Sequence, residues 1–198
     1  MKKIISSLIL SFCLYTYVSA QNNSEHLTFK GVPIDGTLTE YVSKMTKAGL
    51  ELLREHNGTA RLQGDFAGYK DCNITVSTLS NMDVVSSIEV TFPYTIANNW
   101  KLLESNYDKL KSMLTKKYGQ PAEVIEKFDT AFKPKTDEAK VEALSKEEGT
   151  WKTTYETSKG SICLFISKAS LGSVVLLKLE YKDKVNTEVV QDAAMDDL

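Results

Sequence analysis

The clearest secondary-structure signal in the chain is residues 72–77 (CNITVS), where apolar and polar side chains alternate. Cys72, Ile74 and Val76 occupy every second position, and successive side chains of a strand point to opposite faces of a sheet. The stretch therefore predicts a half-buried strand, within a longer strand over 71–79, that turns these three side chains toward the core.

A weak internal repeat surrounds this strand. Gly58-Thr59 recurs as Gly149-Thr150, and Cys72 recurs as Cys163, each time 91 residues later. A period of this length indicates two duplicated units and not a solenoid of short repeats.

The first unit, residues 21–95, has the pattern of one helix followed by strands. Thr37 and Glu40 have the spacing of a capping box, in which each side chain accepts from the other residue's backbone N–H. We expect the helix to begin after Thr37 and to end at Gly49. The expected strands cover 50–54, 59–66, 71–79 and 84–92.

The second unit, residues 96–185, repeats this order. Its helix is predicted from apolar side chains on one face, at Leu103, Tyr107, Leu110, Leu114 and Tyr118. The expected strands cover 123–128, 150–157, 161–168 and 174–181. Every residue of 162–166 (ICLFI) is apolar, which predicts a central strand covered on both faces.

Two segments fall outside the repeat. Residues 129–149 are charged and are expected to form an inserted, mobile excursion, with Thr136 capping a short helix. Residues 186–198 are expected to form a frayed polar tail.

The predicted fold is therefore α+β: a duplicated α-β-β-β-β unit that forms one or two antiparallel sheets with the helices packed on one face. The segments 29–37 (FKGVPIDGT), 66–69 (FAGY), 117–121 (KYGQP) and 196–198 (DDL) carry a resemblance. The architecture resembles the tandem helix-plus-sheet modules of the β-lactamase-inhibitor-protein and small outer-membrane-lipoprotein (SmpA/OmlA) type, and the mature chain is similar to secreted proteins of gut bacteria. These resemblances imply a fold and a compartment, and they transfer no catalytic residue.

The first twenty residues have the three parts of a secretory signal peptide. Lys2 and Lys3 are basic, residues 4–18 are almost wholly apolar or small, and Val18-Ser19-Ala20 offers a cleavage site. No later segment approaches the roughly 20 apolar residues of a membrane span. We expect an exported chain, periplasmic or secreted, that begins near Gln21 and has no transmembrane segment.

The charge pattern excludes two classes of partner. Of 24 basic residues, Lys2 and Lys3 leave with residues 1–20, so 22 remain against 26 acidic residues, a formal net charge of −4. The two signs are interspersed, without the basic stripe that nucleic acid requires or the polybasic segment that binds anionic lipid.

Cys72 and Cys163 are the cysteines that remain after cleavage. If their strands lie close together, they form a disulfide that closes a loop of about 90 residues. If the two units sit end to end, both thiols stay free. Two cysteines without a nearby histidine pair make a poor zinc site, so we expect no metal and no cofactor.

The candidate binding residues are aromatic and lie on or beside predicted strands: Trp151, Tyr155, Tyr69, Tyr94 and Tyr181. Trp151 and Tyr155 share a strand face with Thr153. Were that face open to solvent, it would present a patch suited to a protein or glycan. The alternative is that the helices cover these rings.

The sequence carries no catalytic motif. His26 and His56 have no motif-borne nucleophile near them and are expected to be exposed or to cap local structure. Thr130, within Asp129-Thr130-Ala131, is a candidate modification site because this triplet resembles the O-glycosylation acceptor of gut bacteria.

These observations favour an exported, non-enzymatic binding or interaction module whose partner is an envelope protein or glycan. It would present either a sheet face or the 129–149 excursion. Two alternatives stay open: a small secreted hydrolase that uses paired carboxylates, and a purely structural envelope component.

Overall fold

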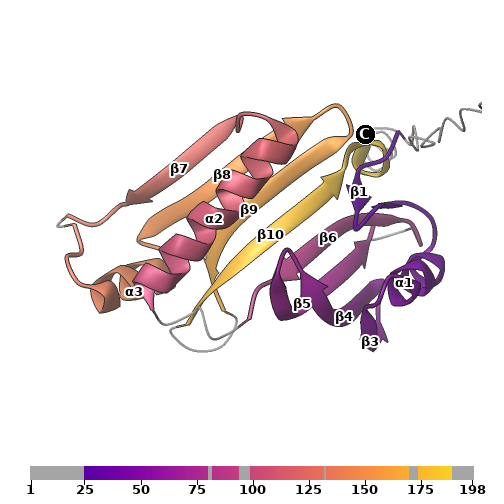
Figure 1. Cartoon of the computed structure of the whole chain (residues 1–198), viewed down its shortest axis with the longest axis horizontal. Coiled ribbons are helices and arrows are strands. Elements are labelled where there is room, and N and C mark those ends of the chain that lie inside the picture. The colour runs from indigo at the N-terminus through magenta and orange to yellow at the C-terminus, as the bar shows by residue number, and fades with distance from the viewer. Residues whose placement is uncertain (1–24, 80–81, 94–98, 132, 170–173, 189–198) are drawn as a thin grey trace, which may run out of the picture.

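The computed structural model of the chain describes residues 25–79, 82–93, 99–131, 133–169 and 174–188. The expected signal peptide, Tyr94 and residues 189–198 of the expected tail lie outside these ranges. The fold is α+β, with one large antiparallel sheet and a small two-stranded one (Figure 1). The bounds of the strands are β1 (Thr28–Phe29), β2 (Val32–Pro33), β3 (Glu51–His56), β4 (Thr59–Phe66), β5 (Tyr69–Thr78), β6 (Val85–Thr91), β7 (Glu123–Phe128), β8 (Gly149–Thr157), β9 (Gly160–Lys168) and β10 (Val175–Asp183).

The eight strands of the large sheet follow the order β3-β4-β5-β6-β10-β9-β8-β7. Each half of the chain forms a four-stranded meander, and the last strands of the two meanders, β6 and β10, pair at the centre. The order helix, then four strands, therefore occurs twice, with one additional helix between β7 and β8. This repeated connectivity is what a duplicated unit requires, and the duplication itself stays a prediction.

Local sequence signals fix the helices. Helix α1 (Leu38–Lys47) begins at the expected capping box of Thr37 and Glu40. Helix α2 (Trp100–Tyr118) begins at Asn99, whose side chain accepts from the N–H of Leu102, and stops at Gly119, where φ is +88°. Helix α3 (Asp137–Ser145) is capped by Thr136, as expected.

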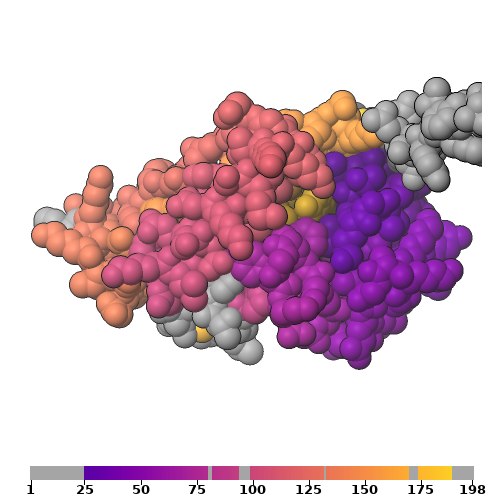
Figure 2. Space-filling view, in the orientation of Figure 1, coloured from indigo at the N-terminus to yellow at the C-terminus, as the bar shows by residue number. Residues whose placement is uncertain are grey.

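The helices lie on one face of the sheet. The register joins Ile74, Val90, Leu179, Leu164 and Thr153 into a row across five strands, so these side chains share a face. All five are buried. We call this side the helix face; seen from it, α2 hides much of β8–β10 (Figure 2).

Helices α1 and α2 and the β1–β2 hairpin cover most of the helix face. Helix α1 buries Tyr41 and Met45 over the first meander, while α2 buries Tyr107, whose hydroxyl lies 2.6 Å from Thr153 Oγ1. The β1–β2 hairpin covers the central pair, with the Phe29 ring 5.4 Å from the Tyr181 ring. Because all of these side chains belong to one hydrophobic cluster, the sheet has a single core.

The expected excursion over 129–149 is partly wrong. Helix α3 buries Val141 and Leu144 in the core cluster, and Lys140 Nζ lies 5.2 Å from the centre of the Trp100 ring on α2. The segment is therefore anchored by apolar burial along half of its length.

The expected start of the frayed tail is also wrong. Asn186 is buried, and its side-chain amide donates to the carbonyl oxygens of Ile34 (3.1 Å) and Val85 (2.8 Å). These hydrogen bonds hold the chain after β10 against the first unit.

Candidate functional site: the open face of the sheet

The face opposite the helices is polar and partly exposed. One row across it contains Thr75, Glu89, Glu180, Cys163 and Thr154, none of which is fully buried. We call this side the open face. It is the broad surface on which a described side chain can meet a partner without moving a helix.

Phe165 is the largest apolar side chain in the middle of the open face. In the register it stands between Lys178 on β10 and Lys152 on β8. A hollow of about 490 Å³ lies there, and Phe165, Cys163, Lys152, Lys168, Ser167 and Glu180 contribute to its lining. An aromatic ring flanked by lysine stems is suited to contact with a partner that is itself part apolar and part polar.

The sequence-based prediction for β9 is therefore wrong in one respect. The strand is central, but residues 162–166 are not covered on both faces: Ile162, Leu164 and Ile166 are buried on the helix face, while Cys163 and Phe165 are half-buried on the open face. Sequence reasoning missed Phe165 because an unbroken apolar run hides the alternation of a strand. Its polar neighbours Ser161 and Ser167, at even spacing from Phe165, were the available signal.

Ion pairs balance the charge of the open face around Phe165. Lys178 Nζ lies 3.0 Å from Glu89, Lys182 Nζ 3.1 Å from Glu180, and Lys152 Nζ 3.0 Å from Glu123. The Glu123 carboxylate raises the pKa of Lys152 by hydrogen bonding. This part of the face therefore carries fixed charges of both signs beside Phe165.

The aromatic binding patch predicted from the sequence is wrong for three of its members. Trp151, Tyr155 and Tyr181 are 8%, 0% and 4% exposed, because they point to the helix face. The Trp151 ring meets the Trp100 ring of α2 at 4.9 Å, and the Tyr155 hydroxyl donates to the Lys111 carbonyl oxygen of α2 at 2.9 Å.

The other two predicted aromatic residues do not restore the patch. Tyr69 is half-buried, and its hydroxyl donates to Asn106 Oδ1 of α2 at 2.5 Å. Tyr94 lies outside the described residues. The aromatic side chains that the sequence placed in one binding surface therefore serve mainly to attach α2 and the β1–β2 hairpin to the sheet.

Of the two alternatives for Cys72 and Cys163, the structure has the free thiols and contradicts the disulfide. Strands β6 and β10 separate β5 from β9, which places the two cysteines about 14 Å apart at the usual strand spacing, whereas bridged Cα atoms lie within about 7 Å. They also face opposite sides, since Cys72 shares the helix face with Ile74 and Cys163 lies on the open face. The sequence repeat at the cysteines is therefore out of register with the strands.

Neither thiol is activated. Burial raises the pKa of Cys72 to about 11, and burial also raises the pKa of Cys163. Since the thiolate is the nucleophile, a raised pKa leaves both groups as unreactive thiols at neutral pH.

Among the described residues, the facing carboxylates lack the features of the acid pair that the hydrolase alternative requires. Glu89 and Glu180 stand opposite each other on the open face, but each is ion-paired with its own lysine. In the part of the chain that the structure describes, the carboxyl groups with a displaced pKa are Asp65 and Glu142, and hydrogen bonds from Lys70 and Lys146 lower both pKa values. A general acid needs a pKa displaced upward, so these groups do not suit that role.

The histidines and the predicted modification site have local surroundings. His26 Nδ1 lies 3.0 Å from a carboxylate oxygen of Asp183, which is fully buried, while His56 is exposed at the end of β3. Thr130 is half-buried in the bend after β7, where the neighbouring Asp129 pairs with Lys127 at 2.7 Å. Modification of Thr130 stays a prediction.

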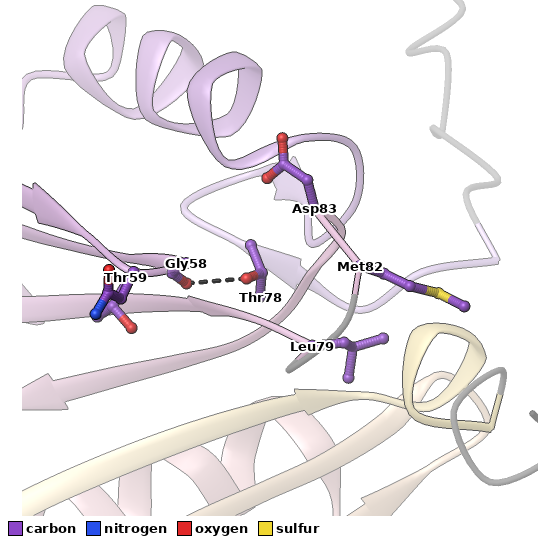
Figure 3. A pocket seen from close by; sticks show the side chains of 7 residues that line it. Gly58, Thr59, Thr78, Leu79, Met82 and Asp83 are labelled. Atoms are coloured by element: carbon purple, nitrogen blue, oxygen red, sulfur yellow. Dashed lines mark hydrogen bonds between the residues drawn. The ribbon is translucent and has the colours of Figure 1, made fainter. Parts of the chain in front are cut away.

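A second hollow, of about 520 Å³, lies beside the Asn57-Gly58 turn (Figure 3). Its polar groups have structural roles: Thr78 Oγ1 donates to the Gly58 carbonyl oxygen at 3.0 Å, and Asp83 accepts from the Leu38 N–H at the start of α1. The Thr78 and Asp83 side chains of this hollow therefore hold the turn and the start of α1 in place.

Within the described ranges, no cluster of histidine, cysteine and acidic side chains has the geometry of a metal site. No helix in that part of the chain is long and apolar enough to cross a membrane. No protein-family model matches the chain, and neither does any curated protein or solved structure.

Proposed function

We propose that the protein is an exported, non-enzymatic binding module that contacts an envelope protein or glycan through the open face of its sheet, around Phe165. The observation that carries the proposal is the asymmetry of the sheet. One face is buried beneath α1, α2 and the β1–β2 hairpin, and the other presents half-buried side chains along all of β8, β9 and β10.

The chemistry of the open face supports binding over catalysis. Phe165 offers apolar area, and Lys152 and Lys178, each paired with a glutamate, flank it as polar neighbours. Interfaces combine an aromatic anchor with a polar rim in this way. The Cys163 thiol beside it is unactivated and the facing carboxylates Glu89 and Glu180 are each paired with a lysine, so none of these described groups suits the role of nucleophile or general acid.

Site-specific photo-crosslinking in intact cells tests this proposal. A photoreactive amino acid replaces Phe165 in one strain and Lys116, an exposed residue of α2, in a matched control strain. We expect discrete crosslinked species from position 165 and none from position 116. Digestion of the adduct with protease or with glycosidases then separates a protein partner from a glycan.

Two results would contradict the proposal. Equal crosslinking from positions 165 and 116 would show that the open face has no special role. An N-terminus at Met1 on the chain recovered from cells, instead of one near Gln21, would refute export.

A further inference from the structure

The chain has only two arginines, and the sheet places them side by side. Arg54 on β3 and Arg61 on β4 are direct cross-strand partners, and both are exposed. Arg61 pairs in turn with Thr75 on β5, so the two guanidinium groups lie on the open face, at the end of the sheet far from Phe165. Like charges directly opposite each other destabilise a pair of strands.

A β-bulge creates this pairing. Leu52 pairs with Leu62 and Arg54 pairs with Arg61, which leaves Leu53 as an extra residue on β3. In a regular strand Arg54 would point to the same face as Leu52, because side chains alternate. The bulge instead turns Arg54 to the open face beside Arg61, which is how bulges redirect side chains next to functional sites.

A tight turn holds the hairpin that carries the two arginines. Asn57 and Gly58 have φ of +46° and +68°, the positive values of a two-residue hairpin loop closed by His56 and Thr59. The Gly58 carbonyl oxygen accepts from the Thr78 N–H at 2.9 Å and from its hydroxyl at 3.0 Å (Figure 3). The hairpin is thereby tied to β5.

The basic side chains of this hairpin are unpaired within the described ranges, although β3 also carries Glu51 and Glu55. Neither Arg54, Arg61 nor His56 forms an ion pair with any residue that the structure describes, whereas Lys152 and Lys178 on the same face each have an acidic partner. Together with Thr59, the three basic side chains line a hollow of about 270 Å³.

We propose that Arg54, Arg61 and His56 form a binding site for a tetrahedral oxyanion, a phosphate or sulfate group carried by a larger ligand. Each guanidinium offers a planar fork of N–H donors that matches such an anion, and the Thr59 hydroxyl supplies one further donor. The anion would also remove the repulsion between the two arginines. The site requires neither Phe165 nor export. Its test is therefore independent of the test of the proposed function.

Because the chain has two arginines, the Nε–Hε region of a ¹⁵N-labelled sample contains two signals, one from each member of the site. Titration with sodium phosphate or sodium sulfate at pH 7 is expected to change the chemical shifts of both signals, and both changes should follow the same saturable binding curve. Sodium chloride at equal ionic strength is expected to cause no saturable shift. Acetate, as the carboxylate probe, is expected to bind at least threefold more weakly.

Variants sharpen the test. Arg61→Gln is expected to weaken sulfate binding, followed at the Arg54 signal, by about tenfold, the loss of one charge-assisted interaction. Arg61→Lys keeps the charge but loses the planar fork of donors. Its affinity for sulfate is expected to lie between those of the wild type and Arg61→Gln. Lys116→Gln removes the same charge from α2 and is expected to leave the titration unchanged.

Several results would overturn the proposal. These are shifts that follow chloride as closely as sulfate, acetate binding as tight as sulfate binding, or an Arg54 response that Arg61→Gln leaves intact. The wild-type titration decides the first two, so the test does not depend on the variants folding.

Discussion

Glu89 on β6 and Glu180 on β10 stand directly opposite each other at the centre of the sheet, where the two halves of the chain join. Opposed carboxylates repel, but each has its own lysine: Lys178 lies 3.0 Å from Glu89, and Lys182 lies 3.1 Å from Glu180. The join between the halves therefore depends on charge pairing on its open face as well as on apolar packing on its helix face.

This arrangement predicts that Lys178→Met destabilises the protein by about 1 kcal/mol, because it leaves Glu89 facing Glu180 without a counter-charge. The side chains of Lys178 and Glu89 are 21% and 31% exposed, so solvent screens their pair only in part. Urea unfolding at low salt measures the change, because urea is uncharged and does not screen the pair.

Two further variants act as controls for that prediction. Lys182→Met, at a lysine that is 53% exposed, should cost less than about 0.5 kcal/mol. Glu89→Gln added to Lys178→Met should recover most of the loss. A double variant no more stable than Lys178→Met alone would show that carboxylate repulsion is not the cause.

The hydrogen bond between Tyr107 and Thr153 predicts strong coupling between α2 and the sheet. Both side chains are fully buried, with 2.6 Å between Tyr107 Oη and Thr153 Oγ1. Thr153→Val should destabilise by about 1–3 kcal/mol, because it buries the phenol without a partner.

Tyr107→Phe with Thr153→Val removes both polar groups and should cost less than the sum of the single changes. A thermodynamic double-mutant cycle measures this coupling energy. A coupling energy of zero would mean that the two hydroxyl groups contribute to stability independently of each other.

The elements of this fold were predictable because their signals are local. The Thr37 capping box, the apolar face from Leu103 to Tyr118 and the strand over 59–66 all follow from neighbouring residues, and the structure has each of them. Lateral strand order is not a local property. The repeat of Cys72 at Cys163 gave no sign that β6 and β10 would pair between them.

The candidate site was less predictable, because it depends on which strand face the helices cover. Trp151 and Tyr155 alternate as a strand should, but only the position of α2 shows that they face inward. The Arg54–Arg61 pair depends on a bulge at Leu53. No local pattern in residues 51–56 (ELLREH) predicts that bulge.

The buried tyrosines predict a loss of stability in alkali. Burial raises the pKa of Tyr41, Tyr107 and Tyr181 above the ordinary value of about 10. Above pH 10 the unfolded chain releases phenolic protons that the folded chain retains, so the free energy of unfolding falls as the pH rises. Each such group contributes up to about 1.4 kcal/mol per pH unit.

Tyr41→Phe separates this effect from lysine titration. The Tyr41 hydroxyl is buried, with no hydrogen-bond partner among the described residues, so its removal should be neutral or slightly stabilising at pH 7. Between pH 10 and 11.5 the stability of the variant should fall with a slope that is smaller than that of the wild type by up to about 1.4 kcal/mol per pH unit. Unfolding curves at several pH values measure both slopes, and equal slopes would assign the alkaline loss to other groups.

The two free cysteines predict a graded thiol reactivity. In denaturant without reductant, alkylation of the mature chain should label both Cys72 and Cys163, because no disulfide joins them. In the native protein at pH 8, Cys163 should react first, since it is half-buried on the open face while Cys72 is fully buried with its pKa raised to about 11. Peptide mass mapping after timed alkylation measures both rates, with Cys72→Ser and Cys163→Ser chains assigning each adduct. If native Cys72 is labelled as fast as Cys163, the first meander opens faster than the thiol reacts. If neither cysteine is labelled in denaturant, the two are joined by a disulfide.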